Sequence, residues 1–300
     1  MPTEMGKSLA SKAKHQFMYA LIFIGGRSVA YLFLYVLVAV YSVLPSVFKR
    51  SQAYITRRFK PTNKWQFFKH TYLLNLTFGR TLVDRAALGI LGRTGVQSTR
   101  PERQQLIDWA TQKKGALLLT AHVGCWQMAV NLTGFIPAKL HVLYYRHPQD
   151  YDKTVAQHSG QDAPFDFIDP SGPLGGVVEM LSALQKGEIV CAMADRVFGN
   201  EKNTVLVDFL GGKMRVPFSF YKLAAATGAP LGILFFSWEG KGVFRTHTCP
   251  PLRVDPQAKT AADFAPYAQQ FASALEDFCI KYPYQFFNYF NVWSDEKNGG

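Results

Sequence analysis

The pattern of hydrophobic and polar positions divides this chain into an apolar beginning and a longer part in which short apolar runs alternate with amphipathic ones. Near the N-terminus Phe17–Ile24 is apolar, Gly25-Gly26-Arg27 interrupts it, and Ser28–Phe48 contains no charged residue. A helix of about 20 apolar residues spans a bilayer, although the tyrosines and Pro45 also permit a helix in the interface or one buried against the protein. We expect a hydrophobic, membrane-anchoring helix here.

Positive charge follows this apolar run. The basic residues that come directly after it are Lys49, Arg50, Arg57, Arg58 and Lys60. The positive-inside rule places the rest of the chain in the cytoplasm, and the same side chains would either attract anionic headgroups or form a solvated face. We divide the chain into an anchor with its basic segment, residues 1–60, and a single domain, residues 61–300.

From residue 63 onward the rhythm becomes that of a layered α/β protein. Helical spacing predicts helices at 63–92, Pro101–Lys113, Trp126–Leu132, Pro148–Gln157, Leu174–Gln185, Phe218–Thr227 and Ala261–Tyr282. Short apolar runs predict strands at Gly115–Ala121, His141–Arg146, Glu188–Ala194, Val205–Leu210, Leu231–Trp238 and Val243–Cys249. This alternation predicts an α/β fold with a mixed, partly parallel central sheet flanked by helices.

The stretch GALLLTAHVGCWQ carries the strongest chemical signal. His122 follows a buried strand and precedes a helix, the place where open α/β sheets bind ligands. Gly124 gives the turn the freedom to bring His122 off the helix, and the amides of the first helical turn would then face the group that His122 contacts. The arrangement suits acyl transfer, in which such amides receive a developing oxyanion.

Other polar side chains follow other strands. Arg146 ends the His141–Arg146 strand, and Asp195-Arg196 follows the Glu188–Ala194 strand. We expect these groups to converge with His122 on one edge of the sheet, although strand-end salt bridges would look the same.

Five pieces of sequence occur in an order typical of one family. They are HVGCWQ, YRHP, DRVFG followed by VDFLGG, TGAP, and the closing segment YPYQFF, Tyr282–Phe287. The chain resembles, over most of residues 17–293, the lysophospholipid acyltransferase superfamily, in particular the branch of lipid A late acyltransferases and phosphatidylinositol-mannoside acyltransferases.

The resemblance implies a mechanism and exposes one departure from it. In the family the histidine is the general base, and an acidic residue five positions later orients its ring; here His122 matches, but Gln127 replaces the acid. Three interpretations remain open: Asp195 supplies the carboxylate, Gln127 suffices, or the protein is a catalytically weak relative. The resemblance also implies substrate-binding roles for Arg146 and Arg196, near Gly124 and Trp126, and no covalent intermediate; Cys125 is expected to be a packing residue.

Composition restricts the partners. The net charge is +12, and the four cysteines have no metal-binding or disulfide spacing. We therefore expect no metal or other cofactor. The resemblance implies an acyl carrier protein or acyl-CoA as donor and a glycolipid or other amphipathic acceptor at the cytoplasmic face of a bacterial inner membrane. The basic balance suits such partners, since acyl carrier proteins and the cytoplasmic leaflet are acidic. The rival is a non-catalytic lipid-binding scaffold. The sequence has no G-x-S-x-G motif, which a serine lipase would need. Only the positive net charge favours nucleic-acid binding, because no recognisable nucleic-acid-binding motif is present.

Overall fold

The computed structural model describes residues 4–91, 95–97, 100–111, 115–127, 136–145, 165–197 and 203–294. Its helices are α1 (Glu4–Ser42), α2 (Pro45–Phe59), α3 (Lys64–Leu91), α4 (Arg100–Thr111), the 3₁₀ turn η2 (Pro173–Gly176), α6 (Val177–Gln185), α7 (Ser219–Thr227) and α8 (Ala261–Lys281). Its strands are β1 (Gly95–Gln97), β2 (Ala116–Thr120), β3 (Leu140–Leu143), β4 (Asp166–Ile168), β5 (Ile189–Met193), β6 (Thr204–Phe209), β7 (Gly212–Pro217), β8 (Leu231–Gly240) and β9 (Val243–Thr248).

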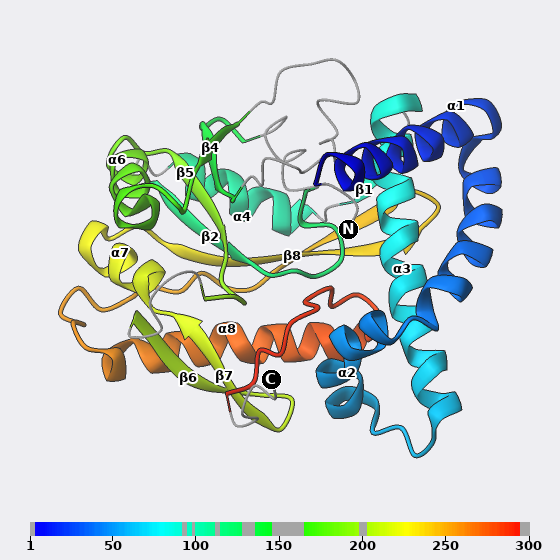
Figure 1. Cartoon of the computed structure of the whole chain (residues 1–300). Coiled ribbons are helices and arrows are strands. Elements are labelled where there is room, and N and C mark those ends of the chain that lie inside the picture. The colour runs from blue at the N-terminus through cyan, green and yellow to red at the C-terminus, as the bar shows by residue number, and fades with distance from the viewer. Residues whose placement is uncertain are drawn as a thin grey trace.

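Seven of these strands form the central sheet, in the order β1-β9-β8-β2-β5-β3-β4. Neighbouring strands run parallel except for β8 and β9, which are antiparallel. The expectation of a mixed, partly parallel sheet flanked by helices is therefore confirmed. Figure 1 shows α8 running along one side of the sheet, with the β6–β7 ribbon beside it.

The sequence prediction missed or misplaced several elements. The strands β1, β4 and β7 were not predicted, and β6 belongs to a separate two-stranded sheet with β7 instead of the central one. Both β1 and β4 contain three residues, too few for a periodic signal. The predicted helix Pro148–Gln157 lies outside the described residues, as does most of Trp126–Leu132.

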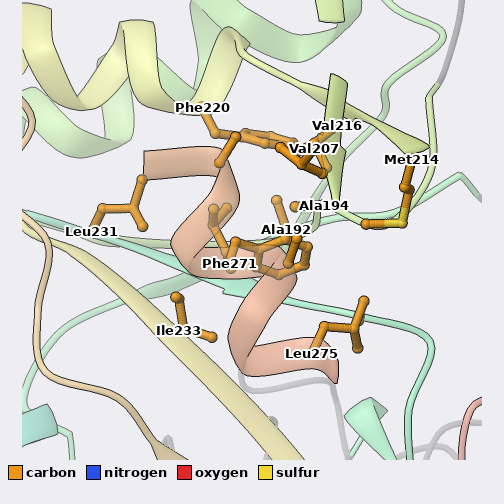
Figure 2. Close-up of a cluster of buried hydrophobic side chains, with 14 of the residues drawn as sticks. Ala192, Ala194, Val207, Met214, Val216, Phe220, Leu231, Ile233, Phe271 and Leu275 are labelled. Atoms are coloured by element: carbon orange, nitrogen blue, oxygen red, sulfur yellow. The ribbon is translucent and has the colours of Figure 1, made fainter. Parts of the chain in front are cut away.

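Apolar side chains from both layers fill the space between the sheet and α8. Figure 2 shows Phe271 and Leu275 of α8 facing Ile233 of β8 and Ala192 of β5, with the β6–β7 ribbon closing one side. Tyr54 and Ile55 of α2 belong to the same core. The opposite face of the sheet packs on α4, where Leu106 and Trp109 are buried. The sheet is thus covered on both sides, as continuous apolar strands such as β2 require.

The apolar N-terminal run forms a bent helix. Within α1, Gly26 has φ 65° and ψ −166°, a conformation that an L side chain rarely adopts, and Figure 1 shows the bend. The helix ends at Ser42, so the charge-free run Ser28–Phe48 does not form one continuous helix, because Pro45 begins α2. By length and composition Gln16–Ser42 is a candidate membrane span, with a mean hydropathy of 2.0.

One face of α1 packs on α3. The buried contacts join Ile22, Ala30, Leu34 and Val38 of α1 to Leu76, Val83, Ala86 and Ala87 of α3. At the bend, Arg27 Nε lies 3.4 Å from Asp84 Oδ1, and Asp84 Oδ2 accepts hydrogen bonds from Trp238 Nε1 and the Gly242 amide, both at 2.6 Å. The other face of α1 stays exposed, with Phe23 at 74% and Ile24 at 84%. The helix is therefore fixed to the domain by one side only.

The basic segment after the apolar run is helical, which the charge pattern did not predict. Two of its cations serve the fold: Arg58 donates to the carbonyls of Cys279 and Ile280 at the end of α8, and Arg57 stacks on Trp293. Lys49, Arg50 and Lys60 are exposed. The cationic surface is smaller than the sequence suggests.

Candidate active site

Strand register brings two of the predicted site residues together. The parallel strands β2 and β5 are neighbours, and Thr120 of β2 pairs with Met193 of β5. His122 and Asp195 each lie two residues beyond this pair, at the same edge of the sheet. Their side chains meet there, as the expectation of convergence at strand ends requires.

His122 and Asp195 form a close hydrogen-bonded pair. His122 Nδ1 lies 2.9 Å from Asp195 Oδ1 and 3.1 Å from Oδ2, and the His122 amide donates to Asp195 Oδ2 at 3.1 Å. An ionised carboxylate only accepts, so the imidazole proton is assigned to Nδ1. This tautomer leaves Nε2 unprotonated and able to accept a proton.

Asp195 is held as a buried anion. Its side chain has 0% exposure, compared with 15% for His122. Burial by itself raises the pKa of the Asp195 carboxyl, but the charge and hydrogen bonds of His122, together with Arg196, bring that pKa below its usual value. The carboxylate is therefore ionised at neutral pH.

The turn that carries His122 is fixed by its backbone. Gly124 has φ +50°, and a Cβ there would lie 1.6 Å from the Phe236 carbonyl oxygen, so the turn requires glycine. The Gly124 amide donates to the Gln285 carbonyl at 2.8 Å, and the Cys125 amide donates to the Phe236 carbonyl at 3.2 Å. These two amides are already occupied. Both residues precede the predicted helix, so the expectation that the amides of its first turn face the reacting atoms stays a prediction, because most of that helix lies outside the described residues.

The closing segment after α8 holds the same turn from the other side. The Phe287 amide donates to the His122 carbonyl at 2.6 Å, and Phe286 forms a bridge with Val123. The Gln285 side chain pairs with the backbone of Trp238 in β8 through both of its ends, at 2.7 and 2.8 Å. The segment YPYQFF, Tyr282–Phe287, was one of the five pieces that carry the family resemblance. In the structure it fixes the position of the histidine.

No hydrogen bond joins Gln127 to the imidazole of His122 in the described part of the chain. Among the described residues its hydrogen-bonding partner is the Cys125 thiol, 3.6 Å from Gln127 Oε1, and His122 Nδ1 is occupied by Asp195. Cys125 is fully buried among apolar side chains. This environment agrees with its expected packing role.

Two further polar residues surround Asp195. Arg196 donates from Nε to Asn288 Oδ1 at 3.1 Å, and its guanidinium carbon lies 4.5 Å from the Phe290 ring centre. Asn288 Nδ2 donates to Asp195 Oδ2 at 3.1 Å and to the Asp195 carbonyl at 3.3 Å. Sequence reasoning missed Asn288, whose only signal was its place directly after the closing motif. Arg146 lies outside the described residues.

A cavity of about 570 Å³ opens beside the pair. Its polar wall includes His122, Gln127 and Arg196, and Gly124 and Trp126 also line it. Its apolar wall comes from many elements: Phe78 and Leu82 of α3, Leu143 of β3, Val177 and Met180 of α6, Phe220 of α7, and Phe287. Cavities of this size and character bind small molecules or parts of larger ones. No cluster of three or more metal-binding side chains occurs in the described part of the chain.

These features define an α/β protein in which a histidine, hydrogen-bonded to a buried aspartate, faces a largely apolar cavity. Residues 78–294 match the family described as bacterial lipid A biosynthesis acyltransferase, and the chain belongs to that family. It is an acyltransferase. A comparison with solved structures also matches the chain to the crystal structure of the 1-acyl-sn-glycerophosphate (LPA) acyltransferase PlsC from Thermotoga maritima, at 9% identity and a TM-score of 0.38, over 84% of this chain and 97% of that one. No curated protein sequence gives a significant match to the chain.

Proposed function

We propose that this protein transfers a fatty acyl chain from an acyl thioester to a hydroxyl or amine of a glycolipid or other amphipathic acceptor, with His122 as general base. The observation that carries the proposal is the His122–Asp195 pair beside an apolar cavity. His122 Nε2 takes the proton of the acceptor as its oxygen or nitrogen attacks the thioester carbonyl. The C–S bond then breaks, and the imidazolium returns the proton to the leaving thiolate.

Asp195 has the role that the family gives to the acid five positions after the histidine. It fixes the Nδ1–H tautomer of His122 and stabilises the imidazolium formed during attack. Gln127 belongs to the cavity wall in this proposal, near the substrate and away from the ring nitrogens. The interpretation that Gln127 orients His122 loses its support, since Nδ1 already has a partner.

The remaining polar groups serve binding. Arg196 presents a cation to the cavity and suits a phosphate, on the acceptor or on the arm of a carrier protein or coenzyme A. Trp126, whose ring centre lies 5.4 Å from that of Tyr144, forms part of the wall beside the acyl chain. Arg146 keeps the binding role that the resemblance implies.

The bent helix α1 attaches the enzyme to the cytoplasmic face of the inner membrane. After the bend, residues 28–42 extend about 22 Å, which is shorter than a ~30 Å hydrocarbon core. Because α1 is also fixed to α3 along one face, we favour a helix embedded in one leaflet over one that crosses the bilayer. Its exposed side chains, among them Phe23 and Leu32, would then contact lipid.

The test is turnover by the purified full-length protein in a bilayer that contains a total lipid extract. Thiol release is followed with acyl carrier protein and with acyl-CoA as alternative donors, and mass spectrometry identifies the acylated lipid. We expect a new lipid species that disappears in His122→Ala. A folded protein that binds lipid but releases no thiol from either donor would favour the scaffold alternative.

A further inference from the structure

Asn288 occupies a position between two opposite charges. Its side chain is nearly buried, at 3% exposure, and both ends of its carboxamide are used. The oxygen accepts from Arg196 Nε at 3.1 Å, while the amide nitrogen donates to Asp195 Oδ2 at 3.1 Å. The orientation of the amide is unambiguous, because a guanidinium only donates and a carboxylate only accepts.

This arrangement keeps Arg196 and Asp195 apart although they are adjacent in sequence and attract each other. No ion pair joins the two directly within the described ranges; Arg196 reaches the carboxylate through Asn288. Arginine prefers a bidentate pair with a carboxylate, and a partly buried site strengthens that preference. If the carboxamide were removed, Arg196 Nε would lose its acceptor, and the adjacent Asp195 carboxylate, which already attracts the guanidinium, would be able to take that place.

Direct pairing would change the chemistry of His122. A guanidinium that binds a carboxylate compensates the negative charge of that carboxylate. The carboxylate then stabilises an imidazolium on its other side less strongly. The same movement would withdraw the guanidinium from the cavity that it lines.

We propose that Asn288 is a positioning residue that keeps Arg196 away from the Asp195 carboxylate, so that Asp195 supports His122 and Arg196 stays directed at the substrate. The role rests on the proposed function, since it acts through the His122–Asp195 pair. Phe290 assists by stacking on the guanidinium and limiting its movement.

The first experiment compares Asn288→Leu, which keeps the volume but removes both hydrogen bonds, in two backgrounds. In the unsubstituted protein we expect kcat to fall by about 10- to 100-fold, as when a group that orients a catalytic histidine is lost. In an Arg196→Met background no guanidinium is present to move, so Asn288→Leu should cost less than about threefold, a non-additive result. Equal costs in both backgrounds, or no cost in either, would overturn the proposal, since Asn288 would then not act through Arg196.

The second experiment uses the direction of a pH shift. In Asn288→Leu the acid limb of the kcat profile should move to lower pH, because the imidazolium loses support. In the double variant with Arg196→Met, Asn288→Leu should leave the acid limb where Arg196→Met alone has it, because no guanidinium is left to pair with Asp195. An unshifted acid limb in Asn288→Leu, or the same shift in both backgrounds, would overturn the proposal. Asn288→Ala, which removes the same two hydrogen bonds without adding bulk, keeps the test valid if the leucine variant does not fold.

A third measurement does not depend on turnover. The proton between His122 Nδ1 and Asp195 should give a downfield NMR signal in the unsubstituted protein, lose intensity in Asn288→Leu, and return in the double variant with Arg196→Met. Failure of the signal to respond would refute the role of Asn288. Absence of acyl transfer by the unsubstituted protein would refute the proposed function instead, so the two failures are distinguishable.

Discussion

The variant Asp195→Asn tests whether Asp195 or Gln127 orients His122, and the hydrogen bonds of Asp195 allow its effect on catalysis to be predicted. The carboxylate accepts three donors: His122 Nδ1 at Oδ1, and the His122 amide and Asn288 Nδ2 at Oδ2. A carboxamide has only one oxygen. If this oxygen faces the His122 amide and Asn288 Nδ2, the NH₂ group of the new side chain faces His122 Nδ1. The ring proton then moves to Nε2, and Nε2 is unable to accept a proton from the substrate.

The alternative orientation satisfies Nδ1 but places an NH₂ group against two other donors, so it loses two hydrogen bonds to keep one. The inactive tautomer should therefore dominate. We expect kcat to fall by about 10,000-fold, the cost measured when an asparagine replaces the aspartate of a serine-protease triad, or about 5 kcal/mol at 1.36 kcal/mol per tenfold change.

The assay is thiol release from an acyl thioester, with substrate saturating, and thermal unfolding confirms that the variant is folded. Gln127→Leu is the matched control: it removes the weak contact with the Cys125 thiol and one polar group of the cavity wall but no partner of His122 Nδ1, so at saturating substrate we expect less than about a threefold change in kcat. If Gln127→Leu lost as much activity as Asp195→Asn, or if Asp195→Asn kept more than a tenth of kcat, the assignment of Asp195 would be wrong.

The other predictions concern the same pair and its surroundings. Gln127→Glu should preserve or raise transfer, measured by the same assay, since residue 127 is not a partner of His122 Nδ1. Gly124→Ala should prevent folding or strongly lower the melting temperature, because the new Cβ would lie 1.6 Å from the Phe236 oxygen, whereas Gly211→Ala, with open space around it, should cost far less. Arg27→Met should lower the free energy of unfolding by about 1–3 kcal/mol, measured by denaturant titration, because buried Asp84 loses a charged partner but keeps its hydrogen bonds from Trp238 and Gly242. The lowered pKa of Asp195 contributes stability that is complete above the ordinary aspartate pKa of about 3.9 and is lost as the pH falls through the folded-state value, so Asp195→Asn should flatten the loss of stability on acidification.

The sequence was informative where a site residue can be recognised from the single strand that it follows. The continuous apolar run at residues 116–119 predicted β2, and the position of His122 after it predicted a catalytic turn. Asp195 was a candidate because it also follows a buried strand. What the sequence left open was the choice between Asp195 and Gln127, because strand order is not visible in a single chain: the choice depends on β2 and β5 being neighbours in register.

Asn288 was missed for a different reason. It lies in an irregular segment, 93 residues from its partner Asp195, and neither periodicity nor spacing predicts such a contact. The bend at Gly26 shows the reverse case. The interruption Gly25-Gly26-Arg27 was visible in the sequence, but the role of Arg27 as a partner of buried Asp84 depends on α1, α3 and the β8–β9 turn meeting in space.

Helix α3 has two neighbours with very different surroundings. On one side Phe78, Thr81 and Leu82 line the cavity, and on the other Val83 and Ala87 pack against α1. Only the width of one helix, about 10 Å, separates the two surfaces. If α1 is embedded in lipid as proposed, α3 joins the bilayer to the wall of the cavity, so a change in bilayer thickness that shifted α1 would also shift that wall.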